Sequence, residues 1–309
     1  MTATAAAEVA ERFACFGAHC SVLVIGDGSQ GTADEAAARA KLRLLGWHER
    51  FSRFEPASEL SRLNRDPRPV VGVGELMARM AQASVHAATD TGGLVDATLV
   101  GELERAGYRS DHETSVPLAR ALALAPPRRS AGPSAERSWA KISVDRAART
   151  VRRPPGVRLD SGGIAKGMLA DVLGEALAGH QAYAIDCAGD LRLGGRGDVT
   201  RIVRVASPFG DEILHEFELG EGGVATSGIG KRSWIGPDGS PAHHLLDPAT
   251  GRPAFTGIVQ ATALAPTALG AEVAAKAALL AGPDHARRWL RHGGVVVLDN
   301  GSHRAYEPR

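Results

Sequence analysis

The sequence predicts an α+β fold, because it contains both helical and strand patterns and its second half is mostly strand. Helical content covers 33–51, 76–88 and 164–177. Short alternating runs typical of strands fill most of the second half, with glycine-rich turns between them. No clean parallel strand follows the first strand and helix, so a doubly wound sheet is not expected.

The composition is that of a folded globular protein. With 309 residues, 44% of them hydrophobic and 23% charged, the chain is close to the globular average. No break in composition is sharp enough to mark a boundary, so we expect one domain over 1–309. The net charge of +1 gives no overall field that would attract nucleic acid or an anionic membrane surface.

The sequence also leads to an expectation about cellular location. The 3 cysteines are odd in number and show no CxxC spacing, which argues against a disulfide framework. Residues 1–12 carry Glu8 and Glu11 and lack the cationic start and apolar stretch of a secretory signal. The longest apolar runs are far shorter than the ~20 residues that a membrane span needs. We therefore expect a cytoplasmic protein without membrane insertion.

The first predicted unit is a strand over 20–25, a turn and a helix over 33–51. The turn contains Gly26-x-Gly28-x-x-Gly31, which fits the dinucleotide-binding fingerprint in its spacing and in following a strand. That fingerprint also needs a second parallel strand ending in an acid about 20 residues on, where this sequence still continues the helix. A plain turn is the favoured interpretation, and a Rossmann-type NAD-dependent oxidoreductase is the remote alternative.

The middle of the chain is expected to combine loops with short elements. Residues 54–69 predict a loop or a short helical turn, and 76–88 predict a helix. Residues 126–137, rich in proline, arginine, serine and glycine, predict an exposed loop insertion. Two short strands follow at 141–145 and 150–152.

Strands are predicted through most of the remaining chain, interrupted by one helix. The predicted strands are 182–186, 191–193, 201–205, 213–219 and 295–298. The helix covers 268–280 and is ended by Gly282-Pro283.

The segment from Leu159 to Gly167 has an unusual placement of charge. The apolar periodicity of 164–177 predicts an amphipathic helix with Lys166 in its first turn. A cation there opposes the positive end of the helix dipole, at a cost of roughly 0.3–1 kcal/mol, unless an anion lies beside it. Glycines and free backbone N–H groups at a helix start favour anion binding. The segment therefore predicts a phosphate site, with a solvated lysine in a glycine-rich turn as the plain alternative.

Three later clusters place polar residues in predicted turns between apolar strands. The first, 184–190, carries Asp186 and Asp190 at the end of a predicted strand. These acids can have a chemical role, or they can simply form the turn. The second is Ala-Thr-Ser-Gly at 225–228, whose hydroxyls can hold a phosphate or satisfy a local turn.

The third cluster, 243–253, places two histidines before a tight Asp-Pro-x-x-Gly turn. Histidine titrates near neutral pH, so either His243 or His244 can serve as a general base, although lone histidines are usually structural. The sequence leaves open which of the two faces a site. It contains no GxSxG, GxxxxGK[ST] or HExxH motif, so hydrolase, P-loop and zinc-protease chemistry lack local support.

Five motifs occur in order between about residue 51 and residue 282. They are Phe51-Ser52-x-Phe54 leading to Ser58-Glu59-Leu60-Ser61-x-Leu63-Asn64, Val95-Asp96-Ala97-Thr98, Leu159-Asp160-Ser161-Gly162-Gly163-Ile164-Ala165-Lys166-Gly167, Ala225-Thr226-Ser227-Gly228, and His244-Leu245-Leu246-Asp247-Pro248-x-Thr250-Gly251. In this order the motifs resemble the ApbE family, the FAD:protein FMN transferases. The resemblance implies mixed or antiparallel sheets with packed helices, the T-fold-like architecture of that family.

The resemblance implies a magnesium-assisted transferase. Such an enzyme moves the FMN part of FAD onto a threonine or serine hydroxyl of an acceptor flavoprotein and releases AMP. By position, the residues implied to bind FAD are Leu94, Val95, Asp96, Asp160, Lys166, Thr226, Ser227 and Leu245. The carbonyl of Gly163 corresponds to a backbone metal ligand, and His244 to a catalytic base.

The sequence departs from the family pattern at the metal site. The family's last helix carries an aspartate followed four residues later by a threonine, whereas Glu272 and Lys276 stand here. A glutamate four residues before a lysine is also an ordinary surface ion pair. The rest of 268–280 is almost wholly apolar, so the two charges are predicted to be buried and to need each other or a ligand.

Two hypotheses for the metal site follow from this departure. Either the Lys276 ammonium occupies the place of the cation, or Glu272 binds magnesium weakly with water completing the shell. An altered metal site also leaves a second function open, a non-catalytic homologue that binds FAD without transferring FMN. The sequence does not name the acceptor or the oligomeric state.

Overall fold

The fold is built on an eight-stranded sheet, and the computed structural model describes residues 7–29, 31–110 and 115–309. In spatial order the strands are β1 (Glu8–Cys15), β2 (Ala18–Ile25), β6 (Ala182–Cys187), β7 (Asp190–Gly194), β10 (Gly222–Gly228), β15 (Ile258–Ala265), β16 (Gly294–Leu298) and β17 (His303–Tyr306). Each neighbouring pair is antiparallel. The predicted α+β class with antiparallel sheet is therefore confirmed.

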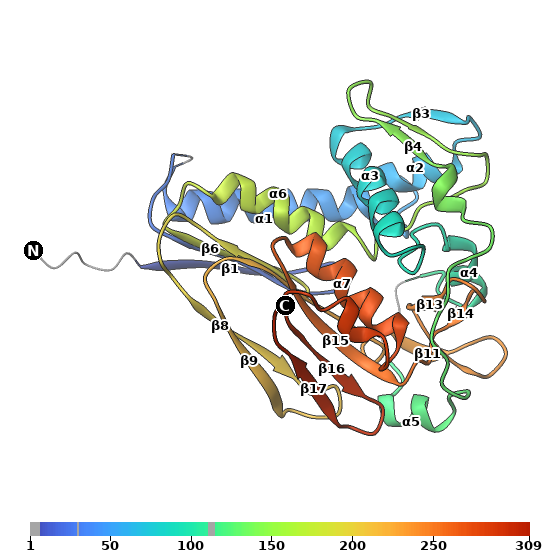
Figure 1. Cartoon of the computed structure of the whole chain (residues 1–309). Helices are drawn as coiled ribbons and strands as arrows, with labels where there is room; N and C mark the ends of the chain where they lie inside the picture. The colour runs from blue at the N-terminus through green and yellow to red at the C-terminus, as the bar shows by residue number, and fades with distance from the viewer. Residues whose placement is uncertain (1–6, 30, 111–114) are drawn as a thin grey trace, which may run out of the picture.

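Three long helices cover one face of this sheet (Figure 1). Helix α1 (Ala33–Phe51) packs on β1 and β2, α6 (Ala165–Leu177) on β6 and β7, and α7 (Ala268–Ala281) on β10 and β15. The sequence predicts all three, α1 with the observed boundaries. Their apolar faces and the facing strands bury two hydrophobic clusters, which supply the main apolar stabilisation of the fold.

Helix α7 approaches its neighbours closely because glycines face its start. A Cβ atom on Gly167 of α6 would lie 2.7 Å from the carbonyl oxygen of Ala268. A Cβ atom on Gly223 of β10 would lie 2.4 Å from the backbone nitrogen of Ala268. Side chains larger than hydrogen do not fit at either position. The close contact brings the two charged residues of α7 next to the first turn of α6.

Smaller elements complete the fold, and most of the shorter helices lie near the end of the sheet where α6 begins (Figure 1). The helices are α2 (Glu59–Arg65), α3 (Glu75–Asp90), α4 (Val100–Arg105) and α5 (Leu118–Ala123), with short 3-10 turns at Ser138–Lys141 and Ala286–Arg288. The strands form a three-stranded sheet, β3 (Val70–Gly72), β5 (Thr150–Arg152) and β4 (Ser143–Asp145), and the pairs β8 (Arg201–Ala206) with β9 (Ile213–Leu219), β11 (Ser233–Ile235) with β12 (Pro241–His243), and β13 (Leu246–Asp247) with β14 (Arg252–Pro253).

The prediction of a turn at 225–228 is wrong. These residues form the second half of β10, in the middle of the sheet between β7 and β15. Their backbones pair with 260–263 of β15, and this ladder outweighs the local turn preference of Thr-Ser-Gly. Strands β1 and β15 are also absent from the sequence prediction, and 54–69 holds the seven-residue helix α2.

The 126–137 segment and the turn that begins at Asp247 are joined by a hydrogen bond. Residues 126–137 contain no helix or strand. The Asp247 carboxylate accepts hydrogen bonds from Gly132 of this loop, at 2.9 Å, and from Ala249, at 3.0 Å. The backbone carbonyl of Asp247 accepts from Gly251, which closes the predicted turn.

The turn at Gly26 is not built as a dinucleotide site. Strand β2 is antiparallel to both of its neighbours, so no parallel strand–helix–strand unit exists there. Thr32 and Glu35 form a capping box at the start of α1, and the Asp27 carboxylate accepts from the N–H of Ala33 at 3.2 Å. The donors that would face a phosphate are thus already bound to side chains. This excludes the Rossmann alternative.

Within the described ranges, no helix is both long enough and apolar enough to cross a membrane. Residues 1–6, on which the expectation about a secretory signal partly rests, lie outside those ranges.

Candidate active site

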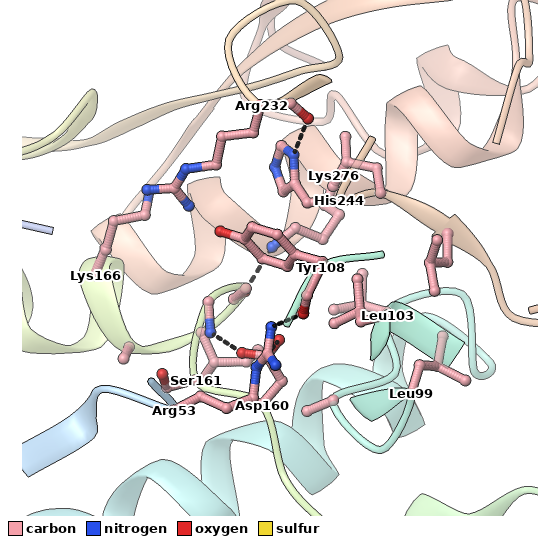
Figure 2. A pocket seen from close by; sticks show the side chains of 18 of the residues that line it. Arg53, Leu99, Leu103, Tyr108, Asp160, Ser161, Lys166, Arg232, His244 and Lys276 are labelled. Atoms are coloured by element: carbon pink, nitrogen blue, oxygen red, sulfur yellow. Dashed lines mark hydrogen bonds and ion pairs between the residues drawn. The ribbon is translucent and has the colours of Figure 1, made fainter. Parts of the chain in front are cut away.

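A cavity opens where the start of α6 meets the end of α1, the 94–99 segment and the 244–246 segment. The predicted site residues that line it are Leu94, Val95, Asp96, Asp160, Gly163, Lys166, His244, Leu245 and Lys276. Figure 2 shows that the labelled side chains reach this space from several elements far apart in the sequence. The structure therefore brings most of the predicted site together.

The turn before α6 is held in place by the first motif. The side chain of Ser58 caps α2, and Asn64 near the end of this helix bonds both backbone groups of Leu159, each at 2.8 Å. The hydroxyl of Ser161 donates to the carbonyl of Phe51 at 2.7 Å. These bonds fix the backbone on both sides of Asp160. The first motif thus holds the third motif in place, and its residues Phe51, Ser52 and Phe54 also line the cavity.

Asp160 lies at the floor of the cavity beside Arg53 (Figure 2). One carboxylate oxygen accepts from Gly162 N at 2.7 Å, and the other lies 3.7 Å from Arg53 Nε. Arg53 also donates to the backbone carbonyl of Tyr108 at 3.0 Å. Its guanidinium group lies over the rings of Phe54 and Tyr108, at 4.5 and 5.2 Å from their centroids. Asp160 is thus held by a buried cation.

Lys166 is paired with a carboxylate of the protein itself. It lies in the first turn of α6 as predicted, and its ammonium group contacts the buried side chain of Asp190 at the start of β7. The expectation that a phosphate is needed to offset the helix dipole is therefore wrong, because Asp190 supplies the anion. The sequence leaves open whether Asp190 has a chemical role or forms a turn, and the structure places it behind the cavity as the partner of Lys166.

The Lys166 and Asp190 pair has shifted acidity. Burial alone would lower the pKa of Lys166, but the carboxylates of Asp190 and Glu272 outweigh it and raise this pKa. Burial raises the pKa of Asp190 to about 7, against the opposing effect of Lys166. Lys166 is therefore a protonated cation at neutral pH, and Asp190 titrates near neutrality.

Glu272 and Lys276 form a second buried pair, as the apolar character of α7 predicts. Their charged atoms are 3.7 Å apart, and their side chains are 3% and 12% exposed. Lys276 Nζ donates to the carbonyl of Gly163 at 2.8 Å, and Glu272 accepts from Gly167 N at 3.0 Å. Burial lowers the pKa of Lys276, and the Glu272 carboxylate opposes this shift.

These residues do not fit a magnesium ion. Magnesium needs near-octahedral oxygen ligands at about 2.1 Å. The carbonyl of Gly163, which would be one ligand, is bonded to the Lys276 ammonium instead, and one oxygen of Glu272 is bonded to a backbone N–H. In the part of the chain that the structure describes, no three His, Cys, Asp or Glu residues are grouped to hold a metal ion. A protonated lysine would also repel the ion.

The structure places His244, and not His243, in the cavity wall. His243 is buried against the ring of Phe255, with centroids 4.9 Å apart. The Nδ1 atom of His244 lies 3.5 Å from the backbone carbonyl of Arg232, as drawn in Figure 2. A carbonyl only accepts, so this contact places the proton on Nδ1 and leaves Nε2 to accept one.

His244 is neutral at physiological pH. Burial lowers its pKa well below the ordinary value, and the cations of Arg232 and Lys276 act in the same direction. Arg232, which belongs to none of the sequence motifs, contributes this charge from the cavity wall. The arrangement supplies a proton acceptor beside several cations.

Asp96 presents a buried oxygen to the cavity. Its Oδ1 accepts from the backbone and the hydroxyl of Thr98, at 2.8 and 2.6 Å. Its Oδ2 is buried, and no hydrogen-bond partner for it occurs among the described residues. Burial also raises the pKa of Asp96. An oxygen held in this way is available to a donor group on a ligand.

Thr226 and Ser227 lie outside the cavity lining. The hydroxyl of Thr226 is 2.9 Å from that of Thr262 on β15, and Ser227 is buried in the sheet. Their phosphate-binding role stays a prediction that this geometry does not favour.

Comparisons with known proteins identify the family and the fold. The ApbE family model matches residues 16–298. The FAD:protein FMN transferase of Chlamydia trachomatis is 33% identical over 66% of this chain and 61% of its own length. That of Klebsiella pneumoniae is 26% identical over 87% of this chain and 77% of its own length. The match to the chlamydial relative thus spans less than two thirds of that protein.

Solved structures share the fold over nearly the whole chain. The ApbE protein of Thermotoga maritima has a TM-score of 0.79 and 25% identity, with 97% of both chains covered. The flavinyl transferase ApbE of Pseudomonas stutzeri has a TM-score of 0.76 and 20% identity, with 100% of this chain and 97% of that chain covered. With the family match over most of its length, this chain belongs to the ApbE family.

Proposed function

We propose that this protein is an FAD:protein FMN transferase, which moves the FMN moiety of FAD onto a threonine or serine hydroxyl of an acceptor flavoprotein. The observation that carries the proposal is the grouping of Lys166, Lys276 and a neutral His244 around one cavity. Phosphoryl transfer needs neutralised phosphate charge and a group that accepts the proton of the nucleophile. The relatives named above bear this activity in their names.

In this proposal the pyrophosphate of FAD binds beside the start of α6. Lys166 and Lys276 face it from two helices, and neither needs a large movement to do so because both already line the cavity. The flavin lies along Leu94, Val95 and Leu245, which are apolar. The buried Oδ2 of Asp96 accepts a hydrogen bond from its polar edge.

The proposed reaction is a single displacement at phosphorus. The acceptor hydroxyl oxygen attacks the phosphorus that carries the riboflavin part, and the anhydride bond from this phosphorus to the AMP oxygen breaks. A phosphodiester forms between FMN and the acceptor, AMP leaves with the bonding electron pair, and His244 Nε2 takes the hydroxyl proton. Lys166 and Lys276 stabilise the charge that develops on the phosphate oxygens and the leaving group.

Flavinylation of an acceptor domain tests this proposal. The purified protein is incubated with FAD and a domain that one of the related transferases flavinylates. We expect the domain to gain the mass of the FMN moiety and AMP to accumulate in equal amount. The control is the same domain with its acceptor threonine or serine replaced by alanine, which should gain nothing.

The altered metal site favours one other function, a homologue that binds FAD without transferring it. In that case intact FAD remains bound and neither a mass gain nor AMP is found, whichever acceptor is supplied.

The cytoplasmic location stays a prediction, which fractionation of the native cells would test.

A further inference from the structure

The four buried charges at the start of α6 form one cluster. Lys166 is paired with Asp190, and Lys276 lies 3.7 Å from Glu272. Glu272 links the two pairs, since its carboxylate also raises the pKa of Lys166. The cluster is neutral when both pairs are ionised, and both lysines line the cavity.

The Lys276 ammonium group lies beside the carbonyl that the family resemblance gives as a metal ligand. Its Nζ atom is 2.8 Å from the carbonyl oxygen of Gly163. A Cβ atom on Gly163 would lie only 2.4 Å from that Nζ, so the ammonium group rests directly against this glycine. Glu272 cannot turn freely towards an ion, because one of its oxygens is held by the N–H of Gly167.

We propose that Lys276 replaces the divalent cation in this protein, so that FAD binds, and its FMN moiety is transferred, without magnesium. The inference rests on the proposed function and adds its cofactor requirement. The site then takes FAD as the free dianion, and its two phosphate charges share the two ammonium groups with the carboxylates of Asp190 and Glu272. A lysine ammonium is a compact point charge that neutralises phosphate without a coordination shell.

The reaction balances without a metal. The bonds made and broken are those of the displacement above, the proton goes to His244, and AMP leaves as a dianion. Lys276, held by Glu272 and the carbonyl of Gly163, provides the fixed positive charge beside the leaving oxygen. No co-reactant beyond FAD and the acceptor hydroxyl is consumed.

Direct metal binding is the first test. Manganese chloride is titrated into the purified protein, with and without FAD, and free manganese is followed by electron paramagnetic resonance. We expect no stoichiometric binding to the unaltered protein. The double variant Glu272→Asp, Lys276→Thr restores the carboxylate and hydroxyl of the family pattern, and we expect it to bind one ion.

The matched control makes the same two substitutions in a partly exposed pair far from the cavity. Glu11 and Lys41 are 2.9 Å apart, with side chains about one third exposed, and lie on β1 and α1 away from the cavity. Glu11→Asp with Lys41→Thr should leave manganese binding and FAD affinity unchanged.

FAD affinity is the second test, measured by flavin fluorescence in EDTA and in millimolar magnesium chloride. The unaltered protein should show the same affinity in both. The double variant should bind FAD more than about tenfold better with magnesium. Lys276→Met, which keeps the length of the side chain without its charge, should lose affinity in both solutions.

Saturable one-to-one manganese binding to the unaltered protein, or FAD binding that requires magnesium, would overturn the proposal. These results are separate from those that test the function. FAD binding in EDTA without any FMN transfer would reject the transferase and leave the metal-free site standing. If the double variant fails to fold, the measurements on the unaltered protein and on Lys276→Met still test whether FAD binds without magnesium.

Discussion

The buried lysine cations at this cavity are stabilised by carboxylates of the same chain. A buried charge is tolerated only when a partner or hydrogen bonds compensate it. Asp190 does this for Lys166, and Glu272 does it for Lys276. The carboxylates therefore have to share their cations with a bound anion, which ties ligand binding to the protonation of Asp190.

FAD affinity is predicted to rise as the pH falls through about 7. Burial raises the pKa of Asp190 to about 7, so acidification protonates it and removes a negative charge beside Lys166. The change should not exceed about tenfold per pH unit, since one proton is involved. Fluorescence titrations between pH 6 and pH 8, a range chosen around that pKa, measure it. The charged or titratable groups facing Asp190 are Lys166, Glu272, Lys276 and Cys187.

Asp190→Asn is the control for this pH dependence. The variant cannot titrate at this position, so its FAD affinity should stay flat over the same range. The raised pKa of Asp190 also determines how its contribution to the stability of the fold changes with pH. A carboxyl group whose folded pKa is raised contributes stability at low pH that is lost as the pH rises through about 7. A pH dependence that Asp190→Asn leaves unchanged would contradict the assignment.

His244→Ala is predicted to slow FMN transfer by roughly 10²–10⁴ while FAD binding is retained, because a general base contributes on that order. His244 contributes a proton acceptor and little binding energy, since it is neutral. Single-turnover rates and FAD affinity, measured on the same preparation, separate the two effects. An equal loss in both would show that His244 acts through binding.

At the scale of elements, the contact between α6 and α7 sets the site geometry. Gly167→Ala should destabilise the protein by about 1–3 kcal/mol, because its Cβ would lie 2.7 Å from the carbonyl oxygen of Ala268. The control is Gly46→Ala in α1, where a Cβ meets nothing within 4 Å. That change should stabilise by about 0.5–1 kcal/mol. Urea unfolding measures both, and equal effects would show that the close contact is unimportant.

The elements that the sequence predicts are those with a strong signal of their own. Helix α1 has a capping box and an amphipathic pattern, and its boundaries are as predicted. The second half of β10 lacks such a signal, because Ala-Thr-Ser-Gly becomes a strand through its pairing with β15. Strand pairing between distant segments is a tertiary effect that local preference does not report.

The same distinction applies to the site. Asp160, Lys166 and His244 belong to motifs with a recognisable order, and the structure puts all three in one cavity. Arg53 and Asp190 became site residues only when folding placed them beside Asp160 and Lys166. Their importance depends on contacts between residues far apart in the sequence, and no spacing pattern encodes such contacts.

For the whole molecule, the cavity is assembled from segments spread along most of the chain. Residues between 16 and 280 line it, and they come from α1, the 94–99 segment, α6, the 232–246 segment and α7. A ligand in the cavity therefore contacts segments that belong to the large sheet and its helices, so its binding energy stabilises their packing. This predicts that a ligand stabilises the molecule as one unit.

FAD should raise the midpoint of a single thermal unfolding transition. At 100 times its dissociation constant, a ligand that binds only the folded state adds about 2.7 kcal/mol, which corresponds to a shift of several degrees in a chain of this size. Differential scanning calorimetry with increasing FAD measures the shift, and it should be the same in EDTA and in magnesium chloride. Lys166→Met should show a smaller one. Two transitions, of which FAD moves only one, would contradict the single domain predicted over 1–309.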